Sequence, residues 1–181
     1  MKKIIALVGN PGSGKNEVAN ILCRVHGYKL IDDSYWLKSI ASRKYNIPVD
    51  WFYDRRYKDE AISDLAGKSP RQLAGELGNE IESLIDPVVF AKLAYSEMPE
   101  SGLYVVPSVR QTQPDFWKSV DATLIEVVRS EAIDPGNNFD WYNAERVDFR
   151  IHNEGTLKDL ENSVASVLRD ATHTKIHANN L

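Results

Sequence analysis

Seven residues near the N-terminus, Gly9–Lys15, have the types and spacing needed to hold phosphate groups. They read Gly-Asn-Pro-Gly-Ser-Gly-Lys, which fits the pattern of a phosphate-binding loop: a glycine, four variable residues, a glycine and a lysine. Closely spaced glycines let the backbone form a concave nest whose N–H groups point at phosphate oxygens, and the lysine reaches the outer phosphates. The loop therefore predicts nucleotide binding, and its expected ligands are Gly9, Asn10, Gly12, Ser13, Gly14 and Lys15.

The position after the loop lysine departs from the common pattern. A Ser or Thr hydroxyl usually binds Mg²⁺ there, whereas this chain has Asn16 followed by Glu17. A side-chain amide oxygen is still an acceptable ligand for a hard cation. We therefore expect Asn16 to bind Mg²⁺, helped by Asp33 or its neighbour Asp32 at the end of a predicted strand. Strand-end and helix-cap roles explain these two aspartates equally well.

Three arginines lie where an open parallel sheet binds its ligand, beyond the carboxyl ends of the strands. Arg110 and Arg129 follow predicted strands, and Arg71 stands at the start of a predicted helix, where backbone N–H groups also favour anions. The planar guanidinium holds phosphate through a fork of donors. Any one of these arginines could equally be a solvated surface charge, but the three together favour phosphate binding.

The elements that must position these residues alternate between strands and helices. Strand-like apolar runs occur at 3–8, 28–31, 103–106, 123–128 and 147–151. The first is followed by the loop and by a helical stripe of Val18, Ile21, Leu22 and Val25. This alternation predicts an α/β fold with a parallel sheet covered on both faces.

More than seventy residues separate the second and third runs, and this stretch is expected to be a helical insertion at the ligand edge of the sheet. Ser69-Pro70 and Asp86-Pro87 are helix-start signals; the apolar residues that follow them are Leu73, Leu77, Leu84, Phe90 and Leu93. The aromatic and charged segment 50–57 is expected to be a partly exposed helix, with a base-stacking surface as the alternative.

A last helix is expected after Thr156, which has Asp159 three residues on in the spacing of a capping box. The tail at 172–181 is polar and is expected to be frayed.

Selective short segments make the chain resemble the bacteriophage deoxynucleoside monophosphate kinases, relatives of the adenylate and dephospho-coenzyme A kinases. Beyond the loop, the resemblance includes Ser-Pro-Arg-Gln-Leu at 69–73, Val-Arg at 109–110 and Asn-Glu-Gly-Thr-Leu at 153–157. It covers most of the chain. The chain departs from the family at two metal-associated positions, since Asn16 replaces the usual residue after the lysine and Ser108 stands where an Asp is common.

The resemblance implies a three-layer α/β/α P-loop NTPase fold with a five-stranded parallel sheet. It implies a single kinase domain with a core at 1–33 and 101–171, a monophosphate-binding insertion at about 34–100 and a short lid at about 129–146. Arg71 and Arg110 would grip the acceptor monophosphate, Arg129 would come from the lid, and Asn153 would lie near the adenine of ATP. The implied cofactors are ATP and Mg²⁺.

Composition limits the remaining classes of function. The 181 residues carry a net charge of −4, which argues against a general nucleic-acid binder. No stretch approaches a membrane span and the N-terminus leads straight into a strand, so we expect a cytoplasmic protein whose partners are small-molecule nucleotides. Whether the chain acts alone or as a homodimer stays open.

Three functions remain open at this point. The first is phosphoryl transfer from ATP to a (deoxy)nucleoside 5′-monophosphate, as implied by the resemblance. The second is the same chemistry on another small acceptor, such as dephospho-coenzyme A. The third is nucleotide binding without turnover, because both usual metal-associated residues are replaced.

Overall fold

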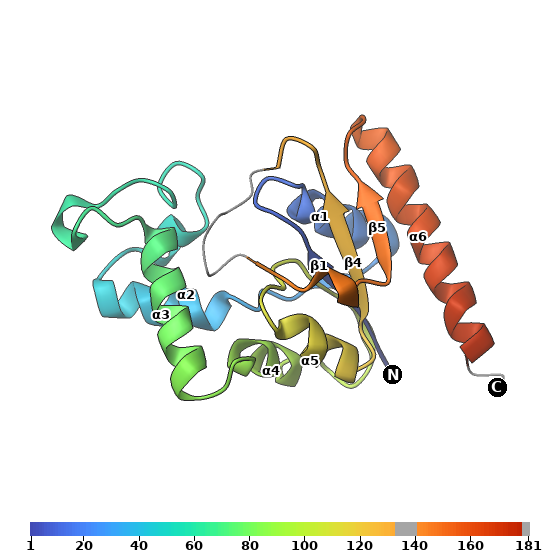
Figure 1. The fold of residues 1–181 in the computed structure, drawn as a ribbon, viewed down its shortest axis with the longest axis horizontal. Coiled ribbons are helices and arrows are strands. Elements are labelled where there is room, and N and C mark those ends of the chain that lie inside the picture. The colour runs from blue at the N-terminus through green and yellow to red at the C-terminus, as the bar shows by residue number, and fades with distance from the viewer. Residues whose placement is uncertain (133–140, 179–181) are drawn as a thin grey trace. The chain divides into compact units, whose positions relative to one another are not determined.

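The computed structural model describes residues 1–132 and 141–178, and Figure 1 draws the rest in grey. Residues 133–140 of the expected lid therefore lie outside the described part. The chain contacts divide it into two compact units, Met1–Asp32 with Ala94–Leu181, and Asp33–Leu93. The second unit ends at Leu93, and the assignment of about 34–100 as a monophosphate-binding insertion stays a prediction.

The first unit is built on a five-stranded parallel sheet with the order β2-β3-β1-β4-β5. Its strands are β1 (Lys2–Val8), β2 (Lys29–Leu30), β3 (Gly102–Val106), β4 (Thr123–Val128) and β5 (Phe149–His152). Strand β1 is central, and its Ile5 pairs with Val105 on one side and with Thr123 on the other. All five predicted strands are present. The three inner strands β1, β3 and β4 are mostly buried, as expected of apolar runs covered on both faces, whereas the edge strand β2 is short and exposed.

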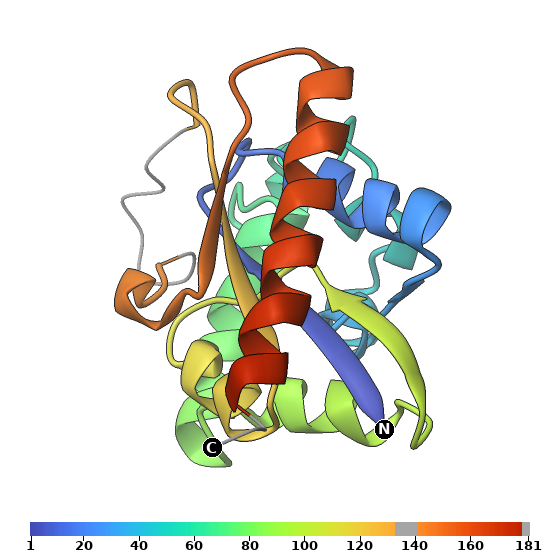
Figure 2. The ribbon, with the colours of Figure 1, turned by 90° about the vertical axis from the view of Figure 1, so that its right-hand side faces the viewer.

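Helices cover both faces of this sheet (Figures 1 and 2). They are α1 (Lys15–His26), α5 (Gln113–Ser119) and α6 (Leu157–Ala178), while α4 (Val89–Ser96) spans the boundary between the units. Helix α1 follows β1 in the connection that leads toward β2. Helix α5 connects β3 to β4, which lies on the other side of β1. Right-handed crossovers in opposite directions place α1 and α5 on opposite faces.

The two faces have separate apolar cores. Helices α1 and α6 pack over Leu7, Ile125, Val127 and Ile151 of the sheet, together with their own Ile21, Leu22, Leu160 and Val164. On the α5 face, Trp117 is fully buried and lies edge-on to Phe116, with ring centroids 5.2 Å apart. The alternation of side chains along each strand sends odd-numbered residues of β4 to the first core and even-numbered ones to the second.

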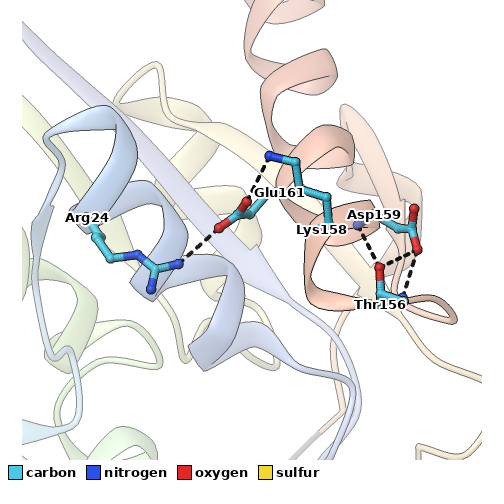
Figure 3. A network of polar contacts seen from close by, with 5 residues as sticks. All are labelled: Arg24, Thr156, Lys158, Asp159 and Glu161. Carbon is cyan, nitrogen blue, oxygen red and sulfur yellow. Dashed lines mark hydrogen bonds and ion pairs between the residues drawn. The ribbon is translucent and has the colours of Figure 1, made fainter.

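The start of α6 is fixed by local hydrogen bonds (Figure 3). The Thr156 hydroxyl accepts from the Asp159 backbone N–H at 3.3 Å, and the Asp159 carboxylate accepts from the Thr156 N–H at 2.9 Å. This is the predicted capping box. Further along the helix, Glu161 pairs with Arg24 of α1 at 3.1 Å, so the two helices also meet through an ion pair at the surface.

The second unit consists of α2 (Tyr35–Tyr45), α3 (Pro70–Leu84) and the short 3₁₀ helices η1 (Val49–Phe52) and η2 (Ser63–Leu65). The predicted start of α3 is confirmed, since Ser69 and Gln72 form a reciprocal capping box and Pro70 takes the first helical position. Helix α2 packs on α3, and the unit's own apolar centre contains Leu37, Ala41, Phe52, Leu73 and Leu77.

Several local predictions are wrong. Segment 50–57 forms η1 and turns instead of a helix, and its Trp51 and Tyr57 rings stack on each other at 5.0 Å. Val25 and Leu84, expected on the apolar sides of their helices, are 55% and 84% exposed. Each lies in the last turn of its helix, beyond the residues against which the rest of the apolar face packs. Most of the tail expected to fray belongs to α6. Within the described residues, the helices lack the combination of length and apolarity required to cross a membrane.

Candidate functional site

The loop after β1 has the backbone conformation of a phosphate nest. Gly9, Gly12 and Gly14 have φ values of 145°, 84° and 101°, which side chains disfavour. At Gly9 a Cβ atom would lie 2.4 Å from the Val127 carbonyl oxygen, and at Gly14 it would lie 2.2 Å from the Asn153 side-chain nitrogen. All three glycines suit the turn, and Gly9 and Gly14 are also needed for the close approach of neighbouring chain segments.

Lys15 begins α1 and folds back over the loop. Its ammonium donates to the carbonyl oxygens of Gly9 at 2.5 Å and Asn10 at 3.0 Å. The ammonium thus lies against the same loop whose N–H groups, with the N-terminal end of α1, favour an anion. The loop residues predicted to bind phosphate thus lie together, and phosphate binding by them stays a prediction.

Asn153 follows β5 and contacts this loop directly. Its side-chain N–H donates to the Ser13 carbonyl oxygen at 2.9 Å, and its backbone N–H donates to the Val128 carbonyl oxygen at 2.8 Å. The residue is therefore part of the support of the phosphate loop. A role for Asn153 in binding adenine stays a prediction.

Two of the predicted arginines lie at the same edge of the sheet as the loop. Arg110 comes four residues after β3 and Arg129 directly after β4, and both strands pair in parallel with β1. Arg110 is only 6% exposed, and its backbone N–H donates to the buried side chain of Gln113 at 3.4 Å. Arg129 is at the surface, where its guanidinium pairs with Glu131 at 2.9 Å. The carboxyl edge thus combines a phosphate loop with two guanidinium groups.

Arg71 belongs to the second unit. It is the second residue of α3 and half-exposed, with Nε 2.5 Å from the Asp59 carboxylate, and its backbone N–H donates to the Lys58 carbonyl oxygen at 3.0 Å. Burial, reinforced by the positive charge of Arg71, lowers the pKa of Lys58. This end of α3 therefore gathers cationic groups, which suits an anionic ligand.

The two predicted magnesium ligands differ in their surroundings. Asn16 is an exposed residue of the first turn of α1, whereas Asp33 is 2% exposed and is the first residue of the second unit. Across residues 1–132 and 141–178, no group of three or more His, Cys, Asp or Glu side chains could hold a metal. The side-chain oxygens of Asn16 and Asp33 are ligands of the kind that Mg²⁺ accepts, and this ion commonly uses only one or two protein ligands beside phosphate oxygens and water.

Sequence reasoning missed a carboxylate beside the site, Glu126 of β4. Its side chain is buried and accepts hydrogen bonds from Tyr142 at 2.7 Å and from Arg150 at 2.5 Å. Burial and the hydrogen bond to Glu126 raise the pKa of Tyr142. The available signal was a single charge inside an otherwise apolar strand, with an arginine in the next strand.

A second carboxylate was also missed. Glu154 accepts from the backbone N–H of Ser130 at 2.6 Å and from its hydroxyl at 2.8 Å. These hydrogen bonds lower the pKa of Glu154, with a smaller contribution from the positive charge of Arg129. Glu154 thus joins the segment that carries Arg129 to the segment that carries Asn153.

Comparison with known proteins adds information on the fold. No protein-family model and no curated protein matches this sequence. A solved structure of TT1252 from Thermus thermophilus is 21% identical, with a TM-score of 0.52 over 93% of this chain and 97% of its own. Dephospho-CoA kinase from Campylobacter jejuni is 12% identical, with a TM-score of 0.52 over 97% of this chain and all of its own. Together with the parallel sheet order and the loop after β1, these likenesses show that the chain has a three-layer α/β/α P-loop NTPase fold.

Proposed function

We propose that this protein transfers the terminal phosphoryl group of ATP to a (deoxy)nucleoside 5′-monophosphate. The observation that carries the proposal is the loop at Gly9–Lys15, because its glycine conformations and the position of its lysine suit the binding of a triphosphate. Arg110 and Arg129 at the same sheet edge supply the charge that a second phosphate group requires. The fold likeness to a dephospho-CoA kinase supports phosphoryl transfer more generally.

In this reaction an oxygen of the acceptor phosphate forms a bond to the γ-phosphorus of ATP. The bond from that phosphorus to the β,γ-bridging oxygen breaks, so the products are ADP and a nucleoside diphosphate. Such a transfer needs little covalent help, because positioning and charge neutralisation provide most of the rate enhancement. The protein's task is to align two polyanions and stabilise the charge that spreads over the transferred group.

Each residue of the site has a defined part in this alignment. The loop N–H groups and Lys15 hold the donor phosphates, Arg110 and Arg71 hold the acceptor phosphate, and Arg129 neutralises the transferred group. Mg²⁺ bound with the nucleotide would neutralise part of the phosphate charge, and Asn16 is a residue of this chain that would hold it. Asp33 is the second residue that we propose helps to hold the ion.

A second acceptor class is favoured by a specific observation. The likeness to the Campylobacter jejuni dephospho-CoA kinase extends over 97% of this chain, so an acceptor that presents a hydroxyl group has to be tested beside the monophosphates. In that case the arginines would bind a phosphate distant from the reacting oxygen. A protein that binds nucleotide without turnover is the third outcome, suggested by Asn16 and Ser108.

The deciding experiment is a coupled assay for ADP release with Mg²⁺, run over all ribo- and deoxynucleoside monophosphates and dephospho-coenzyme A. We expect turnover with at least one monophosphate. Lys15→Ala should lower kcat about 100-fold or more, the loss seen on removing a donor to transition-state charge. Lys158→Ala, which removes an exposed lysine of α6 that pairs with Glu161 three residues on, is the matched control and should keep full activity. ATP binding with no turnover on any acceptor would overturn the proposal.

A further inference from the structure

The carboxylate of Glu126 is an unusual group at its position. It is 7% exposed in the middle of β4, a strand whose other residues are apolar apart from the first. In the sheet register Glu126 lies between Val8 of β1, the residue before the phosphate loop, and Arg150 of β5. Burying a charge costs free energy unless the charge is paired and hydrogen-bonded. The residues that bind the Glu126 carboxylate therefore indicate what role it has.

The partners connect Glu126 to the chain beyond β4. One carboxylate oxygen accepts from Arg150 Nε at 2.5 Å, and the other accepts from the Tyr142 hydroxyl at 2.7 Å. Burial raises the pKa of Tyr142, and the hydrogen bond to Glu126 raises it further, so the phenol stays protonated and donates. The side chain of Tyr142 is thereby fixed to strand β4.

The backbone beside Tyr142 holds the loop that carries Arg110. Gln111 forms a parallel β-bridge with Tyr142, and its N–H donates to the Trp141 carbonyl oxygen. Gln111 has a φ of 51°, in the left-handed region that a non-glycine residue rarely adopts. Such a conformation persists where its surroundings hold it, and it is concentrated at functional sites.

We propose that Tyr142 is a positioning residue, which Glu126 fixes so that the Arg110–Gln111 backbone stays in the conformation that presents Arg110 to a phosphate group. The inference deepens the proposed function, on which it depends for the identity of that phosphate. This role accounts for a charged residue at the buried position 126. A carboxylate accepts a stronger hydrogen bond from the Tyr142 hydroxyl than a neutral side chain would.

The test is Tyr142→Phe, which removes one hydroxyl and keeps the ring. Its matched control is Tyr104→Phe, because the Tyr104 hydroxyl also donates to a protein group, the Ser101 carbonyl oxygen at 2.9 Å, but at the amino end of β3. Hydrogen exchange at the Gln111 amide should be about tenfold faster in Tyr142→Phe, since a hydrogen bond to a charged group that limits local opening is lost. It should be unchanged in Tyr104→Phe.

The functional measurement uses the monophosphate with the highest kcat/KM in the wild-type panel. Tyr142→Phe should raise its KM about tenfold while the KM for ATP stays within about twofold of the wild type, a selective loss of acceptor binding. Glu126→Gln should raise the same KM, and the double variant should be no worse than the more impaired single variant, because both changes remove one coupled interaction.

Three results would overturn the proposal. The first is an unchanged exchange rate at Gln111 in Tyr142→Phe. The second is a faster exchange rate with an unchanged acceptor KM, which would leave Tyr142 a purely structural residue. The third is full additivity of the two variants. If the wild-type protein transfers phosphate to no acceptor, the proposed function fails, whereas the exchange rate at Gln111 still decides whether Tyr142 holds the loop.

Discussion

The side-chain amide of Asn153 donates a 2.9 Å hydrogen bond to the carbonyl oxygen of Ser13, a residue 140 positions earlier in the chain. The same nitrogen occupies the space that a Cβ atom on Gly14 would take. The connection between β5 and α6 therefore supports the shape of the phosphate loop from outside. A loop that binds through its own backbone N–H groups depends on such support, because those groups work only when they are preorganised.

Asn153→Ala should weaken ATP binding about fivefold to tenfold, the usual effect of losing one partly buried hydrogen bond. If Asn153 acts by holding the loop, ATP and GTP should lose affinity equally. If it binds adenine, as the family resemblance implies, ATP should lose more. Equilibrium titration with both nucleotides separates the two roles, and Asn20→Ala, which changes an exposed residue of α1, is the control. An unchanged affinity for both would exclude either role.

Arg71 and Arg110, the two arginines predicted to hold the acceptor, differ in burial, so their substitution should affect protein stability differently. Arg71→Ala and Arg110→Ala should both raise the KM for the monophosphate more than the KM for ATP. Only Arg110→Ala should also lower the melting temperature clearly, because Arg110 is 6% exposed and Arg71 is half-exposed. Steady-state kinetics with each substrate varied in turn, together with thermal unfolding, measures both effects.

Arg56→Ala is the matched control for Arg71, since Arg56 is an exposed arginine of the same unit that is paired with an aspartate, Asp54. It should leave both KM values unchanged. Equal weakening of ATP binding in the Arg71 and Arg110 variants would instead assign these arginines to the donor site.

The substitution at the metal-associated position gives a third prediction. Asn16→Thr restores the common hydroxyl and should keep or raise activity, whereas Asn16→Ala should raise the Mg²⁺ concentration needed for half-maximal activity. The reason is that Mg²⁺ prefers an octahedron of oxygen ligands, and water must replace a lost protein ligand. Titration of activity with Mg²⁺ at fixed ATP measures this, and an identical Mg²⁺ requirement in Asn16→Ala would remove Asn16 from the metal site.

The cap of α6 predicts a change in acid stability. Hydrogen bonds from the Thr156 side chain and backbone lower the pKa of Asp159 from its ordinary value of 3.8. A lowered folded-state pKa means that the stabilisation is present above pH 3.8 and is lost as the pH falls through the folded-state pKa. Asp159→Asn should therefore reduce the free energy of unfolding at neutral pH and flatten its decrease in acid. Urea unfolding at several pH values tests this, with the exposed Asp64→Asn as a control that should behave as the wild type.

The parts of the site that follow from local chemistry could be predicted from the sequence. The glycines and lysine of Gly9–Lys15 define their own geometry, and the placement of Arg110 and Arg129 follows from strands that end at a common edge. The start of α3 was likewise predictable, because Ser69 and Gln72 satisfy each other within one turn.

The parts that depend on distant segments could not be predicted. The burial of Glu126 is explained by its hydrogen bonds from Tyr142 and Arg150, which lie 16 and 24 positions further along the chain. The sequence pattern of 50–57 suggested a helix, but the stacked rings of Trp51 and Tyr57 are formed across a turn. The spacing of apolar residues along a helix does not show where the surface that it packs against ends. Val25 and Leu84 were therefore expected on packed faces, although both are exposed.

Glu126 also bears on how the unfolded chain avoids aggregation. Strand β4 reads Thr-Leu-Ile-Glu-Val-Val, a six-residue run with a strong tendency to form β-structure, in which Glu126 is the single charge. If copies of this segment stacked in register, identical carboxylates would meet at about 4.8 Å, the spacing between neighbouring strands. In the native protein the same carboxylate is neutralised by Arg150 and satisfied by Tyr142. In a fibril the stacked carboxylates would repel one another, which opposes self-association of this segment. In the native sheet Arg150 and Tyr142 offset the cost of burying the charge, so β4 favours its own sheet over a fibril.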